Sequence, residues 1–229
     1  MLERNGAHVV ASKEPSENPV ATAAVDRLVS RRRAGYADDA ARLIRACRDI
    51  IAESGDYSPP VGKILERAGL SSRAFYRLFS TKDELLVAVL HDGTNIMVAH
   101  IEQQMGIADS PIAQIEAWAR SALSPYDESS TSHTGSLLLY FARLGEGVSG
   151  EVARIRDEFL SPLITAITEL RPGADDESTY RAAEFINYAY VGLVSRSENH
   201  GRALDKADID AFCRYTELVA SEFILPTDR

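Results

Sequence analysis

Apolar residues recur at three- and four-residue spacing along most of this chain, and no segment alternates apolar and polar residues as a half-buried strand does. Glycines such as Gly55, Gly69 and Gly201 interrupt the pattern and mark helix ends. With 229 residues, 45% of them hydrophobic, the chain is long enough to bury a substantial core. The sequence therefore predicts an all-α protein.

The spacing predicts helices over residues 38–55, 59–68, 72–79, 82–106, 111–124, 135–144, 151–170, 176–200 and 205–225. Residues 1–36 mix Pro, Ser, Glu, Ala and Gly without sustained periodicity, which predicts a mobile arm with at most a short helix over 21–33. We divide the rest into a helix-turn-helix domain, residues 37–83, and a larger helical domain, residues 84–229.

Several protein classes are disfavoured by what the sequence lacks. No apolar run approaches the roughly 20 residues that a membrane helix needs, and the first thirty residues lack a signal-peptide core, so we expect a cytoplasmic protein without a membrane partner. Cys47 and Cys213 are too few for a disulfide scaffold or a Cys-rich zinc site. The GxGxxG string at residues 145–150 has no flanking βαβ pattern, and no Walker, HExxH or Glu-x-x-His motif occurs. We expect no enzyme activity, cofactor or metal.

Charge is distributed unevenly along the chain. The net charge is −9, yet the segment from Arg27 to Asp83 carries +5, and residues 84–229 carry −12. Such asymmetry favours a module that meets a polyanion, joined to a module that does not. The alternative is a chance excess of charge on a solvated surface.

The helix predicted after Ser71 has two distinct faces. At about 100° per residue, Ser72, Arg73, Tyr76 and Arg77 share one side, and Ala74, Phe75, Leu78 and Phe79 share the other. A preceding helix that ends at Gly69 makes the pair a helix-turn-helix, whose second helix enters a DNA major groove. An ordinary αα-corner between packed helices is the alternative.

The exposed side chains suit a duplex. Arg73 or Arg77 fits the edge of a guanine, and Ser72 can donate or accept. Tyr76 and the amide groups at helix N-termini suit phosphates, as do Lys82, Lys63 and Arg31 to Arg33. The predicted DNA-contacting residues are Lys63, Ser71, Ser72, Arg73, Tyr76, Arg77, Thr81 and Lys82.

The stretch from AARLIRACRDIIAESG to LSSRAFYRLFSTKDELLVAVL resembles the DNA-binding domain of TetR-family transcriptional regulators. VGKILERAG resembles the family pattern VxxIAxxAG, with Leu65 where the pattern has Ala, and SSRAFYRLF matches SxxxxYxxF, followed by a Lys-containing start to the fourth helix. The sequence departs from the family at Pro60, where Thr or Ser commonly caps the second helix, so we expect Ser58 to supply the cap. Gly62 is small where some members have a longer DNA-contacting side chain.

The resemblance implies a helical C-terminal domain that binds a small molecule and forms a homodimer through the last two helices. Those helices are rich in apolar residues, among them Phe185, Ile186, Ala189, Tyr190, Leu193, Val194, Ile209, Phe212, Cys213, Leu218, Val219 and Phe223. Complete burial inside one subunit is the alternative. Candidate ligand-contacting residues are His100, Trp118, Tyr140, Phe141, Phe159, Asn187 and Tyr188, although each also fits an ordinary core position, His100 in particular.

The sequence thus predicts a homodimeric, ligand-responsive regulator, more readily a repressor than an activator, that binds a palindromic operator in double-stranded DNA and is released by a small-molecule effector. The alternative is a helical ligand-binding or scaffold protein whose helix-turn-helix no longer binds DNA. The effector, the operator and the regulated genes have no signature in the sequence.

Overall fold

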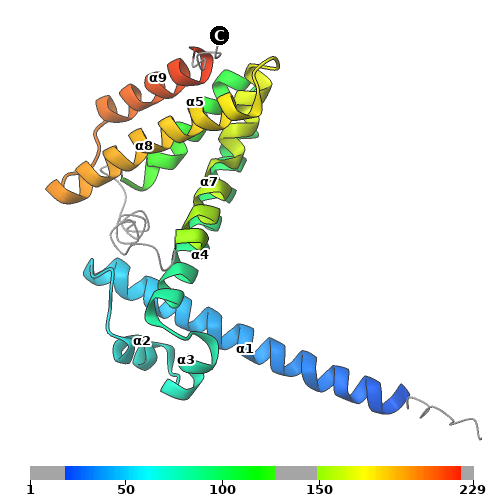
Figure 1. Ribbon diagram of the computed structural model, residues 1–229. Helices are drawn as coiled ribbons and strands as arrows, with labels where there is room; N and C mark the ends of the chain where they lie inside the picture. The colour runs from blue at the N-terminus through cyan, green and yellow to red at the C-terminus, as the bar shows by residue number, and fades with distance from the viewer. Residues whose placement is uncertain (1–18, 127–148, 223–229) are drawn as a thin grey trace, which may run out of the picture. The chain divides into compact units, whose positions relative to one another are not determined.

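The computed structural model describes residues 19–126 and 149–222, and the regular structure in these ranges is helical (Figure 1). The all-α prediction is confirmed. The predicted helix over 135–144 and most of the GxGxxG string lie outside the described residues. The helices are α1 (Pro19–Ser54), α2 (Val61–Ala68), α3 (Ser72–Leu78), α4 (Lys82–Met105), α5 (Pro111–Leu123), the 3₁₀ turn η1 (Ser124–Tyr126), α7 (Ser149–Leu170), α8 (Asp176–His200) and α9 (Lys206–Glu222).

The chain divides into two units, Met1–Asp39 and Ala40–Arg229, with the division inside α1. This first helix begins at Pro19, far earlier than the predicted start at residue 38, and includes the short helix expected over 21–33. Residues 26–38 are all exposed. Because they pack no apolar face against a core, their sequence has no helical periodicity to reveal.

In the second unit, a first hydrophobic core holds the helix-turn-helix together. It is built from the end of α1, both short helices and the start of α4, and Ile155 of α7 also joins it. Side chains in this core are close to fully buried, among them Leu43, Cys47, Ile64, Phe75, Leu85, Leu86, Val89 and Leu90. Its members follow the three- and four-residue spacing of the sequence, as an apolar stripe on each helix requires.

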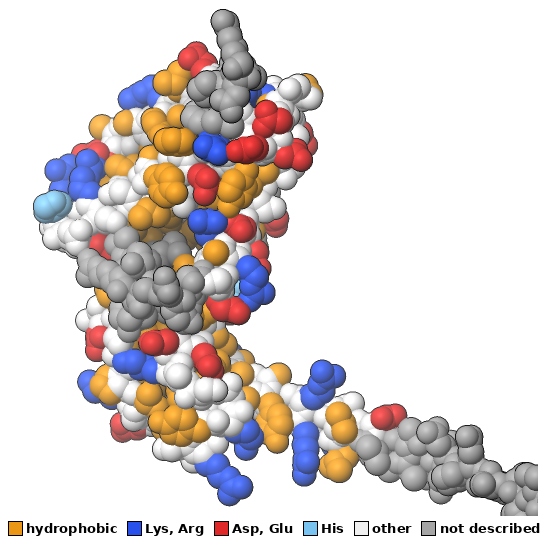
Figure 2. All heavy atoms as spheres, viewed as in Figure 1, with side chains coloured by type: hydrophobic (Ala, Val, Ile, Leu, Met, Phe, Trp, Pro, Cys, Tyr) orange, Lys and Arg blue, Asp and Glu red, His pale blue; other side chains and the backbone are white. Residues whose placement is uncertain are grey.

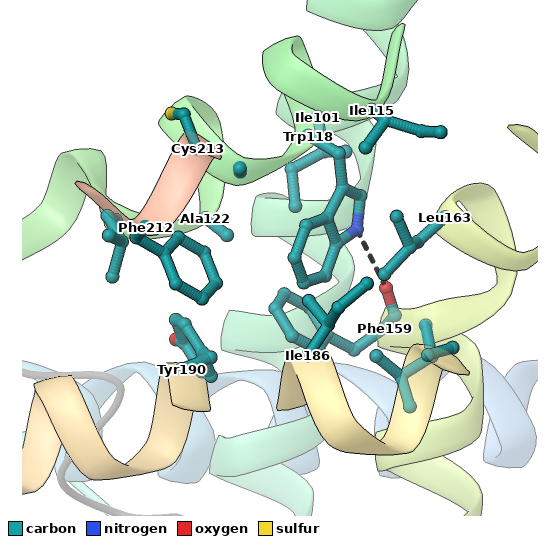
Figure 3. Close-up of a cluster of buried hydrophobic side chains, with 14 of the residues drawn as sticks. Ile101, Ile115, Trp118, Ala122, Phe159, Leu163, Ile186, Tyr190, Phe212 and Cys213 are labelled. Atoms are coloured by element: carbon teal, nitrogen blue, oxygen red, sulfur yellow. Dashed lines mark hydrogen bonds between the residues drawn. The ribbon is translucent and has the colours of Figure 1, made fainter. Parts of the chain in front are cut away.

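A second core lies among α4, α5, α7, α8 and α9, which pack side by side (Figure 1). Trp118 is at its centre, fully buried between Phe159 and side chains from α8 and α9 (Figure 3). The ring centroids of Trp118 and Phe159 are 5.1 Å apart, and the indole N–H donates to the carbonyl oxygen of Phe159 at 3.4 Å. This hydrogen bond satisfies the one polar atom of the Trp118 side chain.

Helix α4 contributes to both cores. Its first turns supply Leu85 and Leu90 to the first core, and its last turns supply Ile101 and Met105 to the second. α7 packs beside α4 and likewise joins both cores, through Ile155 and Phe159. A movement of α4 is therefore felt in both cores, because closely packed interiors transmit displacement.

No helix in the described ranges is long and apolar enough to span a bilayer. Within the same ranges, no three His, Cys, Asp or Glu side chains gather in a way that suits a metal ion.

Candidate nucleic-acid interface

The two faces predicted for α3 are both observed. Phe75 is fully buried and Ala74 nearly so, and Leu78 and Phe79 are partly buried against the same core. On the opposite side Ser72, Arg73, Tyr76 and Arg77 are exposed, Tyr76 to 66%. The Phe75 ring also packs edge to face against Tyr76, with centroids 5.2 Å apart, and against Phe79 at 5.9 Å. The apolar side thus holds the polar side toward solvent.

Ser71 begins α3 as predicted. It has an extended backbone, and its hydroxyl accepts a hydrogen bond from the amide of Ala74 at 3.3 Å. This cap satisfies one of the amides that a helix N-terminus leaves unpaired. The Ser71 hydroxyl keeps its own proton free to donate to an acceptor such as a phosphate oxygen.

The turn between α2 and α3 depends on Gly69, which has φ +63° and ψ +38°. The amide of Gly69 donates to Glu66 and that of Leu70 donates to Leu65, which is the Schellman arrangement. Arg42 of α1 reinforces the turn, because its guanidinium donates to the carbonyl oxygens of Ala68 at 2.6 Å and Gly69 at 3.3 Å. Arg42 therefore neutralises the negative end of α2. In the sequence Arg42 is one of the basic residues between Arg27 and Asp83, and local spacing does not indicate this contact.

The predicted cap of α2 is wrong. The helix starts at Val61 with Pro60 at the cap position and no side-chain cap, whereas Ser58 lies too far back along the chain. The Lys82 ammonium instead donates hydrogen bonds to the Ser58 hydroxyl at 2.5 Å and to the Ser58 carbonyl oxygen at 3.2 Å. Two consecutive prolines place the helix start after Pro60, and a proline offers no hydroxyl for capping.

Helix α4 begins with a capping box, in which a Ser or Thr cap is followed three residues later by Glu. Thr81 accepts from the amide of Glu84, and the Glu84 carboxylate accepts from the amide of Ser80 at 2.6 Å. Lys82 follows directly, so the cap positions its side chain toward Ser58. Lys82 thus ties the start of α4 to the loop before α2, a contact that sequence spacing does not reveal.

Most of the predicted DNA-contacting residues are at the surface. Seven are exposed and Lys82 is partly buried; the exposed ones are Lys63, Ser71, Ser72, Arg73, Tyr76, Arg77 and Thr81. They come from α2, the turn between α2 and α3, α3 itself and the loop between α3 and α4. Their contacts with DNA remain a prediction, and Lys82 has one ammonium donor left after its two bonds to Ser58.

Two ion pairs connect the helices of this region. Arg67 of α2 makes a bidentate pair with Glu53 of α1, with N to O distances of 2.7 and 2.6 Å, and this hydrogen-bonded pair lowers the pKa of the Glu53 carboxyl. Arg48 of α1 contacts Asp92 of α4 at 2.5 Å. The preceding residue on α4 points toward a different helix, since His91 contacts Glu158 of α7 at 3.0 Å. Neighbouring positions of α4 are thus linked to α1 and to α7.

Both cysteine thiols are buried and free. Burial raises the pKa of Cys47 from 9.0 to about 12 and that of Cys213 from 9.0 to about 11. The thiolate is the nucleophilic form. Both side chains are therefore protonated at neutral pH and serve as core residues.

The structure separates the predicted ligand-contacting residues. Trp118, Phe159 and Asn187 are buried, and the first two touch. His100 is exposed on α4, which corrects the expectation of a core histidine: its position falls just outside the buried stripe that includes Ile101 and Met105. Tyr188 is 63% exposed on α8 and lies away from the Trp118 cluster. Tyr140 and Phe141 lie outside the described residues.

A cavity of about 570 Å³ opens between the start of α4 and the start of α7. Its walls are more charged than aromatic, and none of the predicted ligand-contacting residues lines it. The lining residues are Glu84, Val87, Ala88, His91, Glu151, Arg154, Ile155 and Glu158.

Helices α8 and α9 expose large apolar side chains, which Figure 2 shows as a gathering of hydrophobic surface. Phe185 is 44% exposed and Leu218 is 54% exposed, and Phe185 packs edge to face against Tyr188. Other residues of the predicted dimer surface, such as Ile186, Tyr190 and Phe212, are buried within the subunit. We call the exposed set the α8–α9 patch: Phe185, Tyr188, Tyr215 and Leu218.

Comparison with known proteins places the helix-turn-helix in a family. Residues 43–89 match the model of the bacterial regulatory proteins of the tetR family. No curated protein matches the chain significantly in sequence.

Solved structures extend the likeness to the whole fold. A TetR-family transcriptional regulator from Streptomyces coelicolor shares 20% identity over 82% of this chain and 96% of its own, with a TM-score of 0.61. The transcriptional regulator FadR from Bacillus subtilis, solved with stearoyl-CoA, shares 17% identity over 80% and 98%, with a TM-score of 0.62. RolR, solved with resorcinol, shares 20% identity over 85% and 98%, with a TM-score of 0.56. The chain therefore carries the helix-turn-helix domain of the TetR family and has the fold of TetR-family transcriptional regulators.

Proposed function

We propose that this protein is a homodimeric repressor that binds a palindromic operator and leaves it when a small-molecule effector binds the C-terminal helices. The observation that carries the proposal is the division of α3, with Phe75 buried and Arg73, Tyr76 and Arg77 exposed. A seven-residue helix held by its apolar side presents its polar side to a major groove. In this role Arg73 and Arg77 read base edges, and Ser71, Tyr76, Thr81 and Lys63 hold phosphates.

Selection from random duplexes tests the DNA-binding step. The full chain should enrich a palindromic sequence whose half-sites are about one helical turn apart or slightly more, because two α3 helices of a dimer occupy successive major grooves. Binding should weaken steeply with salt, since phosphate contacts release counterions. A chain that enriches no sequence would favour the alternative of a scaffold or ligand carrier.

Dimerisation is supported by the α8–α9 patch. Three of its members, Phe185, Tyr188 and Leu218, keep more than two fifths of their surface exposed, so one subunit leaves apolar area that a second copy would cover. Leu218→Glu should give a monomer in sedimentation analysis and abolish binding to the palindrome. Thr165→Glu is the matched control, because it also adds one negative charge at an exposed position, and Thr165 lies on α7, which contributes no residue to the patch. If the Leu218→Glu variant is still a dimer, the α8–α9 patch is not the dimer interface.

Effector release is proposed to act through α4. Helix α4 shares one core with α3 and another with Trp118, and it is linked by His91 to α7 and by Asp92 to α1. An effector that fits the Trp118, Phe159 and Asn187 region in one position of α4 and not in another would shift the separation of the two α3 helices. FadR was solved with stearoyl-CoA and RolR with resorcinol, which supports a small-molecule effector here.

The selected duplex also provides the assay for an effector. Compounds that lower its affinity for the wild-type chain should lose that effect in Phe159→Trp, which enlarges a side chain packed against Trp118. Release that persists unchanged in Phe159→Trp would place the effector elsewhere, with the cavity between α4 and α7 as the next candidate.

A further inference from the structure

The part of α1 within the first unit is a cationic helical surface. Four arginines lie within seven positions, Arg27 and Arg31 to Arg33, and Asp26 is the one carboxylate between residues 19 and 37. Every residue from 26 to 38 is exposed. Along the extended helix, Figure 2 shows Lys and Arg side chains projecting into solvent.

These arginines are not neutralised by carboxylates among the described residues. Arg27 donates its Nε to the carbonyl oxygen of Ala23 at 3.1 Å, a bond within its own helix that leaves the other guanidinium donors available. Arg31, Arg32 and Arg33 form no ion pair in the described parts of the chain. Their charge is therefore available to an external anion.

Arg27 and Arg31 form a ridge on one side of the helix. Being four residues apart, they are separated by 40° around the axis and by about 6 Å along it. Ser30 and Ala34 lie beside them on one side of the ridge, and Leu28 lies beside Arg31 on the other. One strand of B-DNA carries a charge about every 3.4 Å along its axis, so two guanidinium groups at this spacing can meet nearby phosphates.

The apolar residues of the same stretch do not form a continuous row. Leu28 and Tyr36 are 55% and 40% exposed, and Arg32 lies between them at four-residue spacing. Burying this row against an apolar partner would bury the Arg32 charge, which is costly without a paired carboxylate. A polyanion suits the surface better than an apolar groove or a second copy of the helix.

We propose that the Arg27–Arg31 ridge binds the phosphate backbone of duplex DNA outside the base pairs that α3 reads. This inference rests on the proposed function, and adds a second DNA contact to it. α1 is one continuous helix whose later residues belong to the helix-turn-helix core, so the ridge is tethered to the reading helix and acts at high effective concentration. It adds affinity without sequence preference, because phosphate contacts carry no base information.

The test compares two duplexes that carry the selected palindrome, one trimmed to the site and one with flanking base pairs. On the longer duplex, Arg27→Gln with Arg31→Gln should reduce the slope of log affinity against log salt by about 1.8, or about 0.9 for each lost phosphate contact. On the trimmed duplex the slope should change much less, and sequence preference should be unchanged on both. Arg27→Lys with Arg31→Lys should retain the wild-type slope.

Arg33→Gln is the matched control. It removes one charge from the same helix, where the double Gln variant removes two, and Arg33 lies about 160° around the axis from Arg31. A slope reduction of about 0.9 in Arg33→Gln would show a general charge effect and contradict the ridge, as would an unchanged slope in the double Gln variant. A wild-type chain that binds duplexes through the ridge without selecting any sequence would leave this inference standing and refute the proposed function.

Two other partners are outcomes of the same experiment. Vesicles of phosphatidylglycerol and phosphatidylcholine should not retain the wild-type chain at the salt where it binds the longer duplex. Retention on vesicles that the double Gln variant loses, with its DNA slope unchanged, would assign the ridge to an anionic membrane surface. A change of oligomeric state in the double Gln variant would assign the ridge to a second copy.

Discussion

The arginines of residues 19–80 and those of helices α5 to α9 are used differently. In the later helices Arg120, Arg181 and Arg196 contact carboxylates at 2.5 to 2.9 Å. In the earlier segment, Arg31 and Arg73 have no such partner among the described residues. Arg48 and Arg67 are paired there, and both pairs connect one helix to another. The charge of a guanidinium that is paired with a carboxylate is largely neutralised, so the group binds a phosphate less strongly. The presence of unpaired arginines therefore indicates a DNA-binding surface better than net charge does.

Of the substitutions predicted here, removal of the Phe75 ring, which supports the exposed side of α3, should have the largest effect on stability. Phe75→Ala deletes a fully buried ring beneath Arg73 and Tyr76 and should lower the free energy of unfolding by about 3 to 5 kcal/mol. Urea denaturation followed by circular dichroism measures the loss. Tyr76→Ala is the control: its ring is 66% exposed, so it should change stability by less than about 1 kcal/mol. Equal losses in the two variants would contradict the assigned faces of α3.

Substituting one unpaired and one paired arginine tests whether the two kinds differ in DNA binding. Arg73→Gln should cost about 1 to 3 kcal/mol of binding to the selected duplex and relax preference at one base pair, as expected of a base contact. Arg181→Gln, which removes a guanidinium paired with Glu177, should leave binding unchanged. Competition between the selected duplex and single-base variants measures both. Weakening by Arg73→Gln that is uniform across all sequences would reassign Arg73 to a phosphate.

The turn that orients α3 is sensitive to one Cβ atom. Gly69→Ala places a side chain at φ +63° and only 3.2 Å from the Arg42 guanidinium, so stability should fall by about 1 to 2 kcal/mol. Gly62→Ala is the matched change within α2, where nothing lies within 4 Å and φ is ordinary, so it should raise stability by up to about 1 kcal/mol. Thermal unfolding of both variants checks the opposite signs, and a shared sign would refute the role of the turn.

Elements with a buried face could be predicted from the sequence, because burial leaves a period of 3.6 residues. The two sides of α3 and the caps at Ser71 and Thr81 follow from local residue order. The start of α1 at Pro19 was missed because an exposed helix needs no apolar stripe. The cap at Ser58 was predicted wrongly because Lys82, distant in sequence, occupies its hydroxyl.

The candidate ligand site was less predictable for a related reason. An aromatic residue in a helix is equally suited to a core, a cavity or an interface. Consecutive residues point about 100° apart around the helix, so a shift of one position changes which of these environments a side chain enters. Asn187 is buried and its neighbour Tyr188 is exposed, although both were expected to contact a ligand. Their different burial depends on how several helices pack around α8, and this packing cannot be predicted from the local sequence.

Breaking a paired arginine should have the smallest effect, and that effect should depend on pH. Arg120 contacts Asp210 at 2.9 Å, and hydrogen bonds first from Lys206 and then from Arg120 lower the pKa of the Asp210 carboxyl. A lowered folded pKa contributes stability above the unfolded value of about 3.9, and this contribution is lost as pH falls through the folded pKa. Arg120 also contacts Glu116 at 2.8 Å. Arg120→Gln should therefore lower the urea midpoint slightly at pH 7 and by less once Asp210 is protonated, because the Asp210 contact then no longer contributes an ion pair. The salt dependence of DNA binding by the Arg120→Gln variant should equal that of the wild type, because the Arg120 guanidinium is paired with a carboxylate and does not contact DNA. A reduced slope of log affinity against log salt would show that paired arginines also contact the duplex.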